Sequence, residues 1–362
     1  MKWDKYNPEN AGKWALVYKT IGEDIKFPSG KDVFGATSFQ GVFTPTGFHR
    51  GSYMLTVDDG DGIDAFPVLR SCSERDAFDK AKDAAKEISD KVEKPSVILM
   101  HATPGFEERV LDGINDVFGN KVPVYGGSAG DDDLTGKWEV FYNGQSTNSG
   151  FLLVGFTGKT FGYFLSGYLP TNKKGVITKA KGRIVYEIDG RPAAIVYNEW
   201  TGGLIERYLD KGGVILADTT LRPVGRVIGR TFGVPKYLLS HPHMVIPESK
   251  ALTFFTEFKE WDEIVLMRGT KEALLKRAKQ VVDMSLKGKD FKGLKGAILI
   301  YCAGCVGVVM DGINEAIENF KDGLGRGVPF VGCATFGEQG CFLPERENRH
   351  GNLMANTIIF AE

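Results

Sequence analysis

The chain contains two stretches that carry the same motifs in the same order, and this repetition constrains its fold more than any other feature. The first, from Val97, reads VILMHATPGFEERVLDGINDVFGNKVPVYGGSAGDDD, and the second, from Ala297, reads AILIYCAGCVGVVMDGINEAIENFKDGLGRGVPFVGCATFGEQG. Each reads as an apolar strand, a glycine-containing turn, a helix with the string DGIN, a second strand that begins VP, and a small-residue turn ending in an acid. The shared strings predict an internal duplication.

The similarity extends in both directions. Residues 65–88 and 263–284 each read as a strand followed by an amphipathic helix, and residues 148–156 and 350–360 each contain an apolar closing strand. Each copy is therefore β-α-β-α-β-β. This pattern predicts an α/β fold of two similar lobes, with mixed sheets, packed helices and a ligand cleft at a pseudo-twofold axis.

Domain limits follow from this pattern. We expect an N-terminal extension over residues 1–29, a first lobe over 30–225 and a second lobe over 226–362. Residues 178–203 lie between the copies and predict a hairpin with a turn at Asp189-Gly190, then a helix after Pro192. His241 and His243 flank a proline and predict a linker. Residues 155–162 resemble a phosphate loop, but Leu153 stands where that motif needs glycine, so we expect a hairpin turn there.

Composition excludes several classes of protein. The formal net charge of the 362 residues is −1, which argues against nucleic acid or an anionic membrane as the main partner. The N-terminus has no apolar signal segment, and the longest apolar run is too short to cross a bilayer. Five cysteines form no disulfide framework in a chain this long. We therefore expect a cytoplasmic protein.

The small-residue turn that ends each copy predicts a ligand site. Glycines let a backbone approach a ligand closely and expose its N–H groups, while an acid can bind an ammonium group. In this hypothesis Asp131 and Glu338 bind a cationic group, Ser128 and Thr335 donate hydrogen bonds, and backbone N–H groups hold an anionic group. The alternative is a turn whose acid only caps the next element. The predicted ligand-binding residues are Gly126, Gly127, Ser128, Gly130, Asp131, Cys333, Thr335, Gly337, Glu338, Gln339, His350 and Asn352.

Cysteines offer a second kind of chemistry. Cys302 and Cys305 form a C-x-x-C after a strand, at the start of an expected helix, where a thiolate can be stabilised. Together with Cys333 they could be redox thiols, metal ligands or buried apolar residues lining a pocket. The equivalent positions of the first copy, around Thr103, carry no thiol. His101 and His350 could each supply an axial ligand to haem.

Five segments carry a family resemblance: VPVYGGSAGDDD, GVITKAKGRIVYEIDGRPAAIVY, ILIYCAGC, GVPFVGCATFGEQG and HGNLMAN. They are similar to segments of the FIST proteins, with their FIST_N and FIST_C halves, over residues 30–362. The resemblance implies a sensory input module for small ligands. Amino acids have been proposed as ligands, and some members bind haem and sense nitric oxide. Members are commonly joined to signalling output domains, but this sequence leaves no room for one, so we expect a separate signalling partner.

These observations lead to one hypothesis and two alternatives. We expect a small-molecule-sensing, ligand-binding protein rather than an enzyme, with an amino acid or similar small polar metabolite as ligand. The first alternative is a cysteine-dependent enzyme or redox protein that uses Cys302, Cys305 or Cys333. The second is a haem-binding gas sensor. The residues expected to line the pocket or take part in redox chemistry are Cys302, Cys305, His101 and Thr103.

Overall fold

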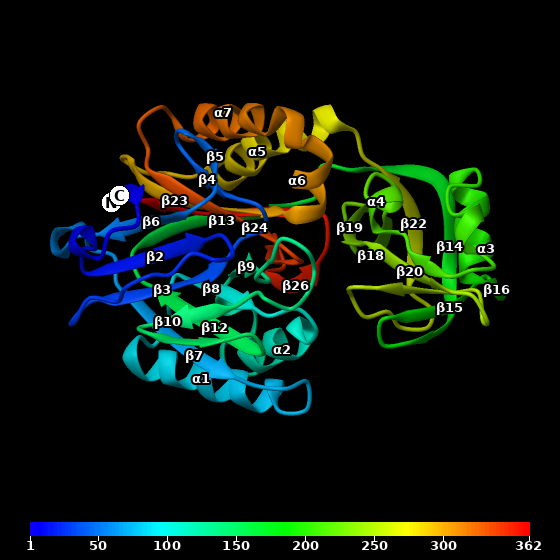
Figure 1. Cartoon of the computed structure of the whole chain (residues 1–362), viewed down its shortest axis with the longest axis horizontal. Helices are drawn as coiled ribbons and strands as arrows, with labels where there is room; N and C mark the ends of the chain where they lie inside the picture. Colours follow the sequence, from blue (N-terminus) through cyan, green and yellow to red (C-terminus); the bar gives the residue numbers. More distant parts are fainter.

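The computed structural model describes residues 1–362, apart from the side chain of Thr231. It has a large body and a smaller lobe that projects from one side of it (Figure 1). The lobe comes from the middle of the chain, residues 169–268, and all other strands belong to the body. The fold is mixed α/β, as predicted.

The first repeat forms one six-stranded sheet of the body. Helices α1 (Ala77–Lys91) and α2 (Glu107–Phe118) cover its outer face (Figure 1). Strand β8 runs parallel to β9 and antiparallel to β12. The strand order is β26 (Glu347–Gly351), β25 (Glu338–Phe342), β9 (Val124–Gly127), β8 (Val97–Ala102), β12 (Gly150–Phe156) and β7 (Ala65–Ser71).

The second repeat forms a similar sheet on the opposite side of the body, covered by α5 (Lys271–Leu286) and α7 (Ile313–Leu324) (Figure 1). The helix α6 (Ala303–Val309) follows its central strand. The unit β24-β23-β27 repeats β9-β8-β12 in order and direction, which is consistent with a duplication. The strand order is β13 (Lys159–Leu165), β27 (Ala355–Ala361), β23 (Leu294–Cys302), β24 (Phe330–Thr335), β4 (Val42–Thr44) and β5 (Gly47–His49).

Two hairpins link the repeat sheets into one interlocked body. The β25–β26 hairpin follows β24 in the chain but pairs with β9 of the other repeat. The β4–β5 hairpin pairs with β24. The second repeat thus completes the sheet of the first repeat, and a hairpin upstream of the first repeat completes the sheet of the second. The two lobes visible in Figure 1 are therefore the body and the inserted lobe rather than the two repeats.

A third sheet closes the side of the body, and the residues expected to be an extension contribute to it. Its strands are β1 (Lys2–Lys5), β6 (Ser52–Val57), β2 (Trp14–Lys19), β3 (Asp32–Thr37), β10 (Val140–Tyr142) and β11 (Gln145–Thr147). The Trp14 ring of β2 lies 5.3 Å from that of Phe156 and 6.4 Å from that of Phe360. These three side chains come from three sheets, so the main core lies where the sheets meet.

The lobe is built around a nine-stranded antiparallel sheet. It carries α3 (Ala193–Thr201), which follows Pro192 as predicted, and the short helix α4 (Leu216–Thr219). The turn at Asp189-Gly190 is also confirmed, with φ of +50° and +73°. The strands in order are β17 (Gly213–Val214), β20 (Pro242–Ile246), β21 (Ala251–Phe254), β15 (Ile184–Ile188), β14 (Leu169–Lys181), β22 (Glu263–Arg268), β18 (Val224–Thr231) and β19 (Val234–Ser240), with β16 (Arg191–Pro192) beside β15.

Four local expectations need correction. Strand β22 was expected beside the second repeat, but it lies in the lobe's sheet, and β13 takes the place equivalent to β7. Residues 155–162 do form a turn, but it joins strands of different sheets and is no hairpin. His241 and His243 belong to the β19–β20 region rather than a linker. The division expected between residues 225 and 226 passes through β18. Among the described residues, none of the helices is long and apolar enough to cross a membrane.

Candidate functional site

A cavity of about 430 Å³ lies where the body faces the lobe. Strands β23 and β24 are parallel, so their carboxyl ends meet at one edge of the sheet and bring Cys302 and Thr335 to the cavity. The body also contributes the start of α6 and the turn after β24. The lobe contributes Leu216, Thr220 and His241, among other residues. The cavity therefore has walls from both parts of the molecule.

The two predicted turns lie side by side at this edge. The Ser128 N–H donates to the Gly337 carbonyl (2.8 Å), and the Phe336 N–H donates to the Ser128 carbonyl (3.0 Å). Gly337 has φ of +127°, and a Cβ there would lie 2.6 Å from the ring of His350. A Cβ on Gly127 would lie 2.6 Å from the Thr335 side chain. Glycine is needed at Gly127 because the two turns approach each other so closely, and at Gly337 because of its positive φ and the nearby His350 ring.

Most of the cavity wall is apolar and aromatic. The Phe336 ring lies 5.8 Å from that of Phe39 and 6.0 Å from that of Trp138. Phe255 of the lobe completes the aromatic part of the wall. The polar side chains that line the cavity are Thr220, His241, Thr335 and Asn352, and none of the described lining residues is a carboxylate, lysine or arginine.

The two predicted ligand-binding carboxylates bind the protein's own atoms. Asp131 is buried and accepts hydrogen bonds from the backbone N–H groups of Leu134 (2.6 Å), Thr135 (3.0 Å) and Lys137 (2.8 Å). Glu338 accepts from the Thr335 hydroxyl (2.8 Å) and the Met354 N–H (2.9 Å). Neither lines the cavity.

The remaining predicted residues divide into two groups. Thr335, Gly337, Asn352 and Cys302 line the cavity. The others, among them Gly130, Thr103 and Cys333, are buried behind its wall. Gln339 lies in this second layer, where its amide nitrogen is 3.3 Å from the Ser128 hydroxyl and 3.0 Å from Nδ1 of His350. The predicted site is thus a compact cluster of which only the front faces the cavity.

A buried ionic network behind the cavity joins the body to the lobe. Arg183 of the lobe donates to Glu107 (2.7 Å) and Glu108 (2.6 Å) at the start of α2. Glu107 is 1% exposed and also accepts from the Ser128 hydroxyl (2.8 Å). Glu108 accepts from the backbone N–H of Glu257 in the lobe (3.0 Å). Glu107, Glu108 and His350 together could hold a metal ion, but the Arg183 guanidinium already supplies the positive charge there.

Sequence reasoning missed this network. The paired acids at the start of α2 are an ordinary feature of a first helical turn, where carboxylates are favoured. Arg183 is 76 residues from Glu107 in the chain, and its partner depends on how the lobe packs. The string PGFEER therefore gave no signal that its acids are bound across an interface.

The C-x-x-C motif lies in the cavity wall. Cys302 is the N-cap residue of α6 and lines the cavity, while Cys305 is fully buried behind it. The Cys305 sulfur lies 3.5 Å from the Tyr168 hydroxyl, beside the buried guanidinium of Arg277. Cys333 instead contacts the carbonyl of Thr37 (3.6 Å), and burial raises its pKa to about 12.

Haem does not fit the predicted histidines. His101 is fully buried, with Nε2 2.9 Å from the Tyr18 hydroxyl and Nδ1 2.7 Å from the Gly127 carbonyl. Burial lowers the pKa of His101 to about 4. His350 uses Nδ1 on Gln339, and its Nε2 is 3.2 Å from the Phe255 carbonyl. Both ring nitrogens of each histidine are engaged by the protein, and neither residue lines the cavity.

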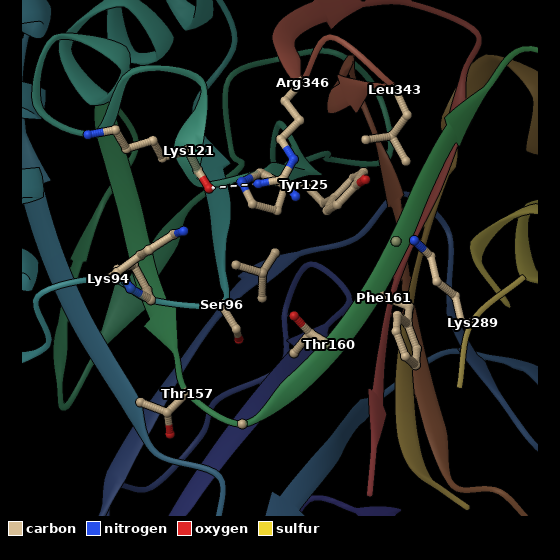
Figure 2. Close-up of a pocket in the computed structure, with 15 residues that line it drawn as sticks. Lys94, Ser96, Lys121, Tyr125, Thr157, Thr160, Phe161, Lys289, Leu343 and Arg346 are labelled. Carbon is tan, nitrogen blue, oxygen red and sulfur yellow. Dashed lines mark hydrogen bonds between the residues drawn. The ribbon is translucent and has the colours of Figure 1, made fainter. Parts of the chain in front are cut away.

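A second cavity, of about 410 Å³, is lined by residues of the body and has a basic rather than an apolar wall (Figure 2). Lys94, Lys121, Lys289 and Arg346 line it, together with the hydroxyl groups of three Ser and Thr residues. Arg346 donates to the Lys121 carbonyl at 3.4 Å. This lining suits an anion, but no residue of the two predicted turns contributes to it.

Comparison with known proteins gives two family matches and one relative. The FIST N domain family matches residues 24–191, and the FIST C domain family matches residues 193–341. An uncharacterized protein of Methanocaldococcus jannaschii is 28% identical over 214 residues, which cover 54% of this chain and 38% of that protein. The chain thus spans less than two thirds of the relative's length. The two matches meet near residue 192, at the start of α3.

Proposed function

Because the chain belongs to the FIST family, we propose that it is a sensory protein that binds a small metabolite in the cavity between the body and the lobe. FIST domains are associated with ligand binding in signal transduction. One observation carries the proposal: a single cavity is walled by the ends of β23 and β24 on one side and by the lobe on the other. A ligand there contacts both parts of the molecule, which is how many sensors couple binding to domain position.

The lining restricts the class of ligand. Apolar side chains, several of them aromatic, dominate the wall, so the ligand has an apolar portion large enough to contact them. Thr335 and Asn352 offer hydrogen bonds to a small number of polar groups. An amino acid with an aromatic or aliphatic side chain, or a metabolite of similar size, fits this combination. The carboxylates of Asp131 and Glu338 support the wall from behind.

We also propose where the protein acts and how its signal leaves it. All five cysteines are free thiols, which supports a cytoplasmic location. A ligand that bridges the cavity would change the position of the lobe, and a separate signalling protein would read that change. The lobe is the natural contact for such a partner because it projects from the body (Figure 1).

A cavity-filling variant tests the proposal. Gly307 lines the cavity in α6, and a Cβ there meets none of the described atoms within 4 Å. Gly307→Leu should therefore place a side chain in the cavity without a clash at its Cβ. The higher helix propensity of leucine should stabilise α6 by up to about 1 kcal/mol. The matched control is Gly293→Leu, since Gly293 also has open space but does not line the cavity.

The measurement is isothermal calorimetry with the twenty amino acids, followed by native mass spectrometry of the purified protein. We expect one apolar amino acid or a retained metabolite to bind the native protein and the Gly293 variant but not the Gly307 variant. Equal binding by all three proteins would place the ligand elsewhere, and the basic cavity of Figure 2 would be the next candidate.

A further inference from the structure

The C-x-x-C motif and a buried arginine form a cluster beside the proposed ligand cavity. We propose that Cys302 and Cys305 are a reversible redox pair, in which Arg277 holds Cys305 as a thiolate and Cys302 faces the cavity and reacts first. The oxidant is a low-molecular-weight disulfide that enters the cavity. The proposal rests on the positions of the two sulfurs and on the unsatisfied charge of Arg277.

The spacing of the two cysteines suits a disulfide. Cys302 is the N-cap of α6, and Cys305 is the third residue of that helix. Helix geometry places Cα atoms three residues apart at about 5 Å. That separation lies within the range that a disulfide can bridge. Cys302 lines the cavity, so a reagent can reach this sulfur without unfolding the protein.

Arg277 needs an anion that the surrounding hydrogen bonds do not provide. Its side chain is fully buried, and Nη1 donates to the carbonyls of Ser166 (3.0 Å) and Leu353 (2.8 Å). Its Nε and Nη2 have no hydrogen-bond partner among the described residues. A buried guanidinium without a counter-charge is costly. The sulfur of Cys305 lies 4.0 Å from the same Leu353 carbonyl to which Arg277 donates, which places the sulfur close to the guanidinium. On losing its proton, Cys305 would give up its own contact with that carbonyl and supply the counter-charge to Arg277.

The chemistry of the neighbours agrees with this assignment. Burial opposes ionisation of Cys305, but the hydrogen bond from Cys302, the charge of Arg277 and the hydrogen bond from Tyr168 outweigh it and lower the pKa to about 6. Burial raises the pKa of Cys302 well above its usual value. The other titratable groups around the pair are Tyr301 of β23, Glu338 of β25 and, from the lobe, His241, which lies beside Gly304 as the Cys302 sulfur does. At neutral pH Cys302 is therefore a thiol and Cys305 a thiolate.

The reaction balances without another cofactor. Cys302 attacks one sulfur of the small disulfide while the Cys305 thiolate takes its proton, and the disulfide expels a small thiolate. That thiolate takes the proton from Cys305. Cys305 then attacks the sulfur of Cys302, so the protein disulfide forms and the second small thiolate leaves with the negative charge. The protein gives up one proton and two electrons, and one small disulfide becomes one small thiol and one small thiolate.

The test uses hydroxyethyl disulfide as the oxidant and the folded full-length chain. After quenching with N-ethylmaleimide, peptide mass spectrometry should show a Cys302–Cys305 disulfide that dithiothreitol reverses. Cys302→Ser and Cys305→Ser should each abolish it, while the control Cys72→Ser should leave it unchanged. Absence of the disulfide in the native protein, or its persistence in either serine variant, would overturn the proposal.

The role of Arg277 is tested through the thiolate itself. Ultraviolet thiolate absorbance of the native protein should titrate with a midpoint near pH 6, and Cys305→Ser should remove that step. Arg277→Met should raise the midpoint. Should that variant fail to fold, Tyr168→Phe removes the hydroxyl that lies 3.5 Å from the sulfur and 2.9 Å from the competing Thr220 carbonyl, and it should raise the midpoint by up to about one unit. An unshifted midpoint would show that these neighbours do not hold the thiolate. These measurements need no ligand, so their outcome is independent of whether the protein has the proposed sensing function.

Discussion

Glu338 shows how a single buried acid can serve the fold at the edge of a ligand cavity. It lies at the start of β25, fully buried, and its carboxylate joins the Thr335 hydroxyl to the Met354 backbone. Burial raises the pKa of Glu338 to about 8, even though the Met354 N–H and the Thr335 hydroxyl favour the ionised form. The Glu338 carboxyl group is therefore mostly protonated near neutral pH.

This pKa predicts a pH-dependent stability. The folded protein holds the Glu338 proton more tightly than the unfolded chain, whose pKa is about 4.5. The stabilisation from this group is complete below pH 4.5 and is lost as the pH rises to about 8. Glu338→Gln keeps the shape without the charge, so its melting temperature relative to the native protein should rise between pH 5 and 8.

Calorimetric melting at several pH values checks this prediction. Glu315→Gln is the control because Glu315 is an exposed acid of α7. Its melting curve should follow that of the native protein at each pH. If the difference between Glu338→Gln and the native protein stays constant with pH, Glu338 does not titrate as described.

At the scale of elements, the β25–β26 hairpin brings the two repeat sheets into close contact. Gly340 of β25 lies directly under the ring of Phe164 from β13, and a Cβ on Gly340 would lie 2.2 Å from that ring. Gly340→Ala should therefore force the sheets apart locally and lower the free energy of unfolding by about 1–3 kcal/mol. Urea unfolding is the measurement.

Gly229 in β18 provides a matched control for that variant. It is also a strand glycine with ordinary backbone dihedrals, and a Cβ there meets none of the described atoms within 4 Å. Gly229→Ala should be neutral or slightly stabilising. Adding Phe164→Leu to Gly340→Ala should recover part of the loss, because the smaller side chain leaves room. Equal effects of the two alanine substitutions would show that the contact is not strained.

Helices, strands and turns could be predicted where they are determined by residues close together in the sequence. Strand–helix–strand units and the turn at Asp189-Gly190 follow from periodicity and turn residues, which act over a few positions. The pairing of strands could not be predicted, because it depends on contacts between residues that are far apart in the chain. The Asn348 side chain, for example, accepts from the Val124 N–H at a separation of 224 residues. The site divides in the same way: the sequence predicted two paired turns, but the cavity and its aromatic wall depend on the lobe.

At the scale of the molecule, the central question is what holds the lobe against the body. Arg183 is the clearest answer, since one guanidinium binds both Glu107 and Glu108 across the interface. Burial alone would lower the pKa of Arg183, but the two carboxylates outweigh it and keep the charge in place. The network lies beside His350 and Phe255, and Phe255 is part of the cavity wall. The same network therefore holds the lobe against the body and positions part of the cavity wall.

Arg183→Met should loosen this contact because it leaves Glu107 buried without its counter-charge. Loss of one partner of a buried pair costs about 3 kcal/mol, and the partial exposure of Arg183 makes this an upper figure. Arg191→Met is the matched control, since Arg191 pairs with Glu199 at the surface, where both side chains are about half exposed. Hydrogen exchange should become faster around residues 255–258 in the first variant and remain unchanged in the second. Because Phe255 lies in that segment, the Arg183 variant should also bind the ligand more weakly. If its binding weakens while hydrogen exchange stays slow, the Arg183 network does not act on the cavity by holding the lobe in place.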